Sequence, residues 1–145
     1  MTEVDLRTIG DRQDIAILLA RIAQLADAGD PEEYIQCFTT DAVWDLTDAT
    51  DLPMDVQSIT GREALLAGVH ERRAAGIQGP GSHTRHDVSS ITVEVHGDRA
   101  SARSYFRYYR GTDGIPSLAA MGVYADTFVR GEAGWRLHRR TITRG

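Results

Sequence analysis

Asp27 and His86 are the two residues whose types are best suited to acid–base chemistry. Asp27 follows Ile22 and Ala23 at helical spacing, so its carboxylate lies beside the apolar stripe of an expected first helix. It also falls in the last turn, where the helix dipole disfavours a negative charge, so we expect it to need a donor or a cation. An imidazole meets that need. The alternative is that Asp27 caps the turn before Gly29 or faces solvent, as acidic residues mostly do.

His86 begins an expected strand, and His83 in the same segment competes with it for a functional role. A carboxylate bonded to one imidazole nitrogen fixes the tautomer and leaves the other nitrogen free to remove a proton. In a regular strand His86 shares its face with the polar Ser90, Thr92 and Glu94, whereas Ile91, Val93 and Val95 face the other way. Either that face lines a polar cavity or a bulge changes the register. A structural or surface histidine is the alternative interpretation.

Capping signals and helical periodicity predict three helices in the first half of the chain. Each begins with a capping residue and continues with apolar positions three or four residues apart. Asp30 is suited to cap the second helix, since Pro31 follows at the first helical position. Because capping explains Asp30, Asp27 is the acid to which we assign a function. The expected helices start at Asp11, Pro31 and the Thr60–Glu63 pattern, and they end near Gly29, Phe38 and Gly76.

The second half of the chain is expected to be mostly strand. A short strand at Ala42–Leu46 comes first, and Thr47–Asp55 is an irregular surface connection that could form a lid. After the glycine-rich break at Gly76–Gly81, four long strands follow one another, which predicts an antiparallel meander. Helices followed by a sheet define the α+β class, and 145 residues fit one domain. The four strands are expected at His86–His96, Ala100–Arg110, Ser117–Arg130 and Trp135–Thr143.

Composition excludes several classes of function. The net charge is −5 with no basic run, which argues against nucleic acid as a partner. No stretch of about 18 apolar residues is present and the first residues lack a signal-peptide pattern, so we expect a cytoplasmic protein without a membrane partner. Cys37 is the only cysteine, and the five histidines lack zinc-ligand spacing. We expect no metal, and the sequence carries no nucleotide or flavin motif, so we expect no cofactor.

Segments along nearly the whole chain resemble SnoaL-like proteins of the nuclear transport factor 2 superfamily, most closely the scytalone dehydratase and dehydrochlorinase branch. They are Arg21–Asp30, Phe38–Trp44, Gly61–Glu63, His83–His86, Gly97–Ala100 and Trp135–Leu137. The resemblance implies one domain over residues 1–145, a cone-like α+β barrel with three N-terminal helices packed on a strongly curved, mostly antiparallel sheet. It also implies a solvent-poor cavity at the open end and a homodimer or higher homo-oligomer.

The resemblance also suggests roles for individual residues. Dehydratases and a dehydrochlorinase of the superfamily pair the histidine that matches His86 with the aspartate that matches Asp27. Arg140 falls where the dehydrochlorinase has an arginine that stabilises developing negative charge, although Arg136 and Arg139 are neighbours and a solvated strand charge is the alternative. Aromatic and methionine side chains are candidates for a substrate-binding apolar pocket, or else ordinary core: Trp44, Tyr34, Met54, Tyr109 and Tyr124.

The chain departs from better-known members of the superfamily at several positions. Ile22 stands where ketosteroid isomerase has its oxyanion-hole tyrosine, Leu46 where it has its general base, and Val123 near its second acidic donor, although Asp45 and Asp126 stand close by. The water-holding tyrosines of scytalone dehydratase also lack clear counterparts. The resemblance therefore argues against steroid isomerisation by the known apparatus.

Three hypotheses of function follow. The leading one is a cofactor-independent, dehydratase-like lyase or isomerase, in which His86 oriented by Asp27 removes a proton from a small hydrophobic oxygenated substrate. The second is a non-catalytic module that binds a small ligand or a partner domain through the same cavity or the outer face of the sheet. The third is a polyketide cyclase that uses the same pair of residues.

Overall fold

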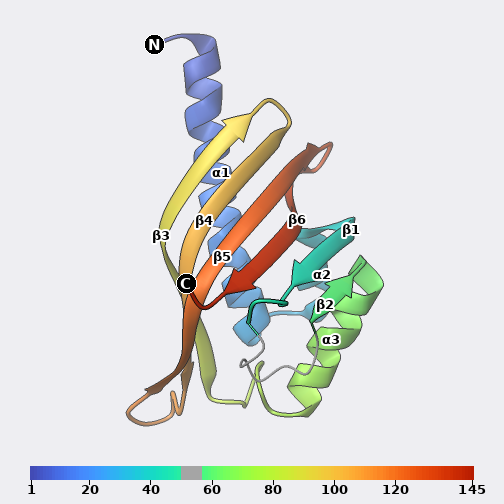
Figure 1. The fold of residues 1–145 in the computed structure, drawn as a ribbon, viewed down its shortest axis with the longest axis vertical. Coiled ribbons are helices and arrows are strands. Elements are labelled where there is room, and N and C mark those ends of the chain that lie inside the picture. Colours follow the sequence, from blue (N-terminus) through green and yellow to red (C-terminus); the bar gives the residue numbers. More distant parts are fainter. Residues whose placement is uncertain (50–56) are drawn as a thin grey trace.

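The structure, a computed structural model, describes residues 1–49 and 57–145. Within this part of the chain, helices and strands follow the predicted α+β order (Figure 1). The helices are α1 (Glu3–Ala28), α2 (Pro31–Gln36) and α3 (Arg62–Ala74). The strands are β1 (Phe38–Asp45), β2 (Ser58–Thr60), β3 (Thr84–His96), β4 (Arg99–Arg110), β5 (Ser117–Gly131) and β6 (Gly134–Thr143).

The described strands form one curved, open sheet in the order β2-β1-β6-β5-β4-β3. Strands β3 to β6 are the predicted antiparallel meander, whereas β1 joins β6 in parallel and carries β2 on its other side. Helix α1 runs behind the long strands (Figure 1). The predicted fold class is confirmed. The sequence did not predict β2, and the expected lid over Thr47–Asp55 falls largely on residues 50–56, which lie outside the described residues.

Helix α1 begins earlier than the sequence predicted, so Asp11 as its cap was wrong. Thr2 is the N-cap, and Thr2 and Asp5 form a reciprocal capping box. Asp11 is instead buried within the helix and faces the sheet. Its carboxylate accepts hydrogen bonds from the Arg130 guanidinium at 2.7 and 2.6 Å and from the Trp135 indole at 3.2 Å. The residue therefore ties α1 to the turn between β5 and β6.

The two shorter helices differ in how they begin. Asp30 caps α2 as predicted, because its carboxylate accepts the Glu32 backbone N–H at 2.9 Å. The predicted capping box at the start of α3 was wrong: Thr60 belongs to β2, and Gly61 at a φ of 93° is the N-cap without a side-chain hydrogen bond. The positive φ explains why glycine is suited to this junction.

A bulge in β3 determines which way His86 points. The pairing of β3 with β4 shifts between Ser89 and Thr92, and Ser90 has a φ of 54°. Before the bulge His86 and Val88 face the helices; after it the partly buried residues are Ile91, Val93 and Val95. The register change that the sequence left open is therefore present. It allows a histidine and an apolar run of the opposite parity to face the same interior.

The core lies between the helices and the sheet. It joins Leu19 of α1, Phe38 of β1, Phe128 of β5 and Leu137 of β6, each no more than 1% exposed. None of the described helices is long and apolar enough to cross a membrane. Towards the end of α1 and the start of β3, polar side chains replace the apolar packing, and the candidate site is there.

Candidate active site

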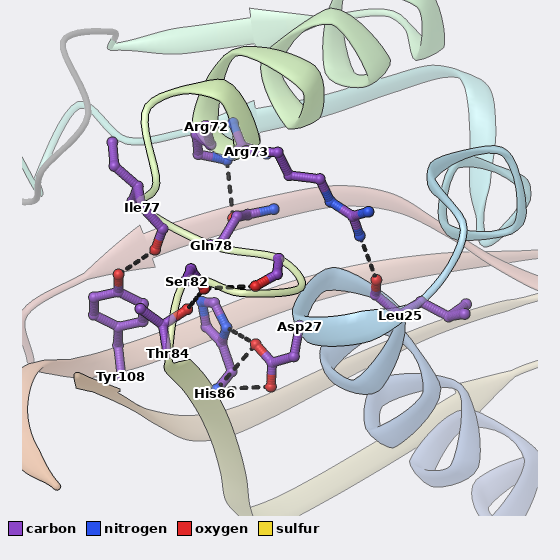
Figure 2. A network of polar contacts seen from close by, with 11 residues as sticks. Leu25, Asp27, Arg72, Arg73, Ile77, Gln78, Ser82, Thr84, His86 and Tyr108 are labelled. Atoms are coloured by element: carbon purple, nitrogen blue, oxygen red, sulfur yellow. Dashed lines mark hydrogen bonds and ion pairs between the residues drawn. The ribbon is translucent and has the colours of Figure 1, made fainter. Parts of the chain in front are cut away.

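The predicted pair is formed in the structure. Nδ1 of His86 lies 2.7 Å from Oδ1 of Asp27, within hydrogen-bond range (Figure 2). The side chains are 19% and 12% exposed, respectively, so the contact is shielded from most of the solvent. Since Nδ1 is engaged by the carboxylate, Nε2 is the nitrogen left to act on a ligand, and it bonds to no other described residue.

Asp27 also holds the backbone of its partner. The His86 backbone N–H donates to Asp27 Oδ2 at 2.9 Å, so one carboxylate binds both the main chain and the ring of the same residue. The last turn of α1 is thereby tied to the first residues of β3. The imidazole is further placed by Tyr108, whose ring centroid is 5.1 Å from that of His86.

Two small cavities share the His86 side chain as part of their walls. The larger has a volume of about 70 Å³ and lies between the sheet and the segment after α3. The smaller, about 30 Å³, lies against α1. Four side chains line both cavities: Trp44, Gln78, His86 and Tyr124. The interior cavity expected at this end of the fold is therefore present, and it is small.

A wider surface depression of about 410 Å³ lies on the outer side of the pair. Both Asp27 and His86 reach its wall, and so does His83. His83 itself is exposed, has a φ of 54° and lines neither interior cavity. The competition between the two histidines is therefore resolved geometrically: His86 meets both Asp27 and the cavities, whereas His83 stays on the surface.

The predicted pocket residues divide into three groups. Trp44, Tyr34 and Tyr124 line the interior cavities. Tyr109 does not, because the inward positions of β4 are the even-numbered ones, and Tyr108 takes its place. Met54 lies outside the described residues. Burial raises the pKa of Tyr34 and of Tyr124, so both hydroxyl groups stay neutral.

Arg140 is buried at the wall of the smaller cavity, with an acidic partner already in place. Its Nε and Nη2 donate to the two carboxylate oxygens of Asp126 at 2.8 and 2.9 Å. Burial alone would lower the pKa of Arg140, but the charge and hydrogen bonds of Asp126 outweigh it and raise that pKa. The guanidinium carbon also lies 3.7 Å from the centroid of the Tyr124 ring. The Arg140–Asp126 ion pair therefore packs against one face of the Tyr124 ring.

Arg72 and Gln78 line the larger cavity, and the sequence analysis missed both. Arg72 is 8% exposed and Gln78 is 6% exposed. Arg72 Nε donates to Gln78 Oε1 at 3.1 Å, on the same cavity wall as His86 (Figure 2). A signal for Arg72 was present: it falls seven residues after Leu65 and three after Val69, on the buried face of α3.

The segment that leads to Gln78 is held by hydrogen bonds at Arg73 and at Ile77. Arg73 Nη2 donates to the carbonyls of Leu25 and Gly29 at 3.1 and 2.7 Å, and the Tyr108 hydroxyl donates to the carbonyl of Ile77. Gly79 follows at a φ of 92°, and a Cβ there would lie 2.8 Å from the Arg73 side chain. Only glycine allows this close approach without displacing Arg73.

Within the described residues, no group of three or more histidine, cysteine, aspartate or glutamate side chains could hold a metal ion. The polar groups that line the cavities are instead an imidazole, phenol rings, an amide, an indole and guanidinium groups. These groups can move one proton and donate several hydrogen bonds. Groups of these types are suited to acid–base chemistry.

The open, curved sheet with helices on one face and an acid–histidine pair at its interior cavities defines an α+β protein of the nuclear transport factor 2 type. Residues 7–141 match the SnoaL-like domain, so the chain belongs to the SnoaL-like family. Comparison with curated proteins gave no match.

Solved structures from two organisms share this fold. A nuclear transport factor 2-like protein with a cystatin-like fold from Novosphingobium aromaticivorans is 30% identical, with 97% of this chain and 85% of that chain covered and a TM-score of 0.79. A protein of unknown function from Mycobacterium tuberculosis, solved with one aspartate replaced by asparagine, is 26% identical (100% and 77% covered, TM-score 0.80). A suggested aromatic ring hydroxylase from N. aromaticivorans is 28% identical (93% and 89% covered, TM-score 0.76).

Proposed function

We propose that the protein is a cofactor-independent, dehydratase-like lyase or isomerase that acts on a small hydrophobic oxygenated molecule. The observation that carries the proposal is the 2.7 Å contact between Asp27 and the Nδ1 of His86, which leaves Nε2 free on a residue that lines both interior cavities. Membership of the SnoaL-like family supports this class of activity. The specific role of Arg140 in stabilising negative charge stays a prediction.

The proposed reaction begins with transfer of a proton from a substrate carbon to His86 Nε2. The carbon–hydrogen electron pair forms a new double bond. In an elimination, the bond from the neighbouring carbon to its hydroxyl group breaks, and the proton on His86 returns to that oxygen to release water. In an isomerisation, an existing double bond next to the new one breaks, and its π pair takes up the same proton at another carbon. Asp27 stabilises the imidazolium that forms in between, because its carboxylate lies against Nδ1–H.

Proton abstraction is the step to test first, because elimination, isomerisation and aldol-type cyclisation all share it. The wild-type protein is incubated in deuterated water with a panel of small cyclic β-hydroxy ketones. Proton NMR then follows exchange of the hydrogen next to the carbonyl and loss of water. We expect His86→Asn and Asp27→Asn each to slow exchange by about 10²- to 10⁴-fold, the usual contribution of a general base.

His83→Asn is the matched control, since it makes the same substitution three residues away at an exposed position. Asparagine tolerates the positive φ of His83, so this variant should keep its fold. We expect exchange at the wild-type rate in this variant. Equal exchange rates in wild type and His86→Asn would contradict the proposal. Ligand binding that is insensitive to His86→Asn, without any turnover, would instead identify a binding module.

A further inference from the structure

Arg72 is a buried cation that lacks an acidic partner. Its side chain lines the larger cavity, and no carboxylate of the described residues lies within ion-pair distance of it. Burial lowers the pKa of Arg72 because the charged form loses its hydration, but a guanidinium remains protonated in proteins. Arg140 differs sharply, since Asp126 neutralises it. An uncompensated charge is costly in such a place unless a ligand meets it.

Two further donors on the same wall also lack partners. Gln78 Nε2 and Trp44 Nε1 are buried without a hydrogen bond to any described residue. Gln78 uses its amide oxygen to accept from Arg72, so its NH₂ group is left over. The Arg72 guanidinium carbon lies 5.3 Å from the centroid of the Trp44 ring, which places the three side chains together. All three are more than nine-tenths buried.

The distribution of unpaired donors favours a ligand rather than imperfect packing. Buried polar groups in proteins are nearly always hydrogen-bonded, so each exception needs an explanation. Among the described residues the other buried side-chain atoms without partners are Nε of Arg62, Nε of Arg73 and Oγ of Ser104. None of these three residues lines the cavity, whereas Trp44 and Gln78 both do, beside His86 and the Arg72 guanidinium, which has no acidic partner among the described residues. The cavity wall is rich in donors and faces the general base.

We propose that Arg72, Gln78 and Trp44 together bind an anionic oxygen of the substrate next to His86. The inference rests on the proposed function, because it supplies that reaction with a site for negative charge. Two sources fit the same chemistry: a carboxylate that the substrate already carries, or an enolate oxygen that forms during reaction. In the second case the proton goes to His86 Nε2, the carbon–hydrogen pair forms a carbon–carbon double bond, and the carbonyl π pair moves to the oxygen.

The dimensions of the cavity limit what reaches these donors. Its volume of about 70 Å³ is well below the roughly 300–1,000 Å³ of typical ligand pockets. We therefore expect the oxygenated end of a substrate, rather than the whole molecule, to enter this space. The group bound by Arg72 is therefore expected to be compact, such as a carboxylate or an enone oxygen with its first carbons.

The Trp44 indole provides a direct test, because the chain has only two tryptophans. Trp135 Nε1 already donates to Asp11 and serves as the internal reference. In a ¹⁵N–¹H NMR titration, crotonate is compared with crotonamide, a neutral molecule of the same shape. If the substrate carries the charge, the Trp44 indole proton shifts downfield with crotonate and moves at least 10-fold less with crotonamide at equal concentration. The Trp135 signal stays in place.

Variants separate the two sources of charge. Arg72→Met should abolish the crotonate response, Arg72→Lys should retain part of it, and Arg103→Met, at an exposed position of β4, should behave as wild type. The enolate is identified as the ligand by two results together. The wild-type protein shows no response to crotonate, and Arg72→Met slows hydrogen exchange of the ketones at least 10-fold. The inference is overturned if crotonate and crotonamide act alike and Arg72→Met leaves exchange unchanged. If only the proposed role of His86 as the base is wrong, the result is different: crotonate still binds, and the rate of hydrogen exchange is the same in His86→Asn as in wild type.

Discussion

At the scale of single residues, the Asp27 carboxylate binds two groups of one partner, the His86 ring and the His86 backbone N–H. It is thus both the orienting group of a proposed base and a structural tie between α1 and β3. These two roles can be separated experimentally. Asparagine keeps one acceptor oxygen in the same place but cannot stabilise an imidazolium, whereas alanine removes both functions.

Asp27→Ala is expected to lower the free energy of unfolding by about 1–3 kcal/mol, because the partly buried backbone N–H of His86 loses its acceptor. Asp27→Asn should lose clearly less stability, while proton exchange falls to a similar extent in both variants. Urea denaturation measures the first quantity and the deuterium-exchange assay the second. Equal stability of the two variants would mean that the backbone contact contributes nothing.

At the scale of elements, the bulge in β3 lets one strand carry a functional histidine and an apolar run on the same side. Within this bulge Ser90 has a φ of 54°. Asparagine and glycine tolerate this conformation, whereas β-branched residues do not. Its side chain is exposed, so a substitution changes the backbone energy with little change in packing.

We expect the free energy of unfolding of Ser90→Val to lie about 1–2 kcal/mol below that of Ser90→Gly, because a left-handed conformation costs a residue with Cβ about that much. Ser90→Gly should be at least as stable as wild type. Chemical denaturation of the pair of variants gives the difference directly. If valine were as stable as glycine at this position, Ser90 would not be the site of strain.

The second element-scale feature is the tie between α1 and the β5–β6 turn through Asp11. Hydrogen bonding to Arg130 lowers the pKa of Asp11 in the folded protein. A lowered folded-state pKa adds stability that is fully present above the unfolded value of about 3.9 and is lost as the pH falls through the folded value. The pH dependence of unfolding should therefore contain a contribution from this one carboxylate.

Asp11→Asn is expected to be less stable than wild type by a constant amount above about pH 5. That difference should shrink below about pH 4, as the wild-type carboxylate takes up a proton. Thermal unfolding across this range tests the prediction, and Asp14→Asn, exposed on the same helix, is the control. A difference that stays constant down to pH 2 would contradict the role given to Asp11.

At the scale of the whole molecule, the order of elements and the four long strands could be predicted because local periodicity and turn signals fix them. The Asp30 cap was predicted for the same reason. The start of α1 was missed because Asp11 also fits a cap, although Thr2 and Asp5 carry the pattern that the helix uses. Strand β2 has only three residues and was too short to show a periodicity.

The site was predictable only in part. Asp27 and His86 followed from helix geometry and family resemblance, but Arg72 and Gln78 come from α3 and the segment after it, and no local pattern joins them to His86. The signal for Arg72 was a charge on an apolar helix face. Tyr108 rather than Tyr109 lines the cavity because the even-numbered residues of β4 face the interior. The apolar residues Ala102 and Phe106 on the same face could have indicated this from the sequence.

The outer face of the sheet bears on the prediction of a homodimer, which follows from the resemblance. Tyr105, Leu118 and Met121 are each about half exposed on β4 and β5. We expect light scattering at micromolar concentration to give twice the chain mass. Met121→Lys should shift the equilibrium toward monomer without unfolding the chain, because a charge placed in an apolar interface is costly. A wild-type protein that remains monomeric at these concentrations would contradict the expectation.

We infer that Asp27 fixes His86 with Nδ1 protonated and Nε2 free to accept a proton. Long-range ¹⁵N–¹H NMR of the imidazole, recorded at a pH where the ring is neutral, measures this without a substrate. We predict a protonated Nδ1 and an unprotonated Nε2 in wild type, and a change of this pattern in Asp27→Ala. A ring protonated at Nε2, or one that averages freely between the two tautomers in wild type, would contradict the account.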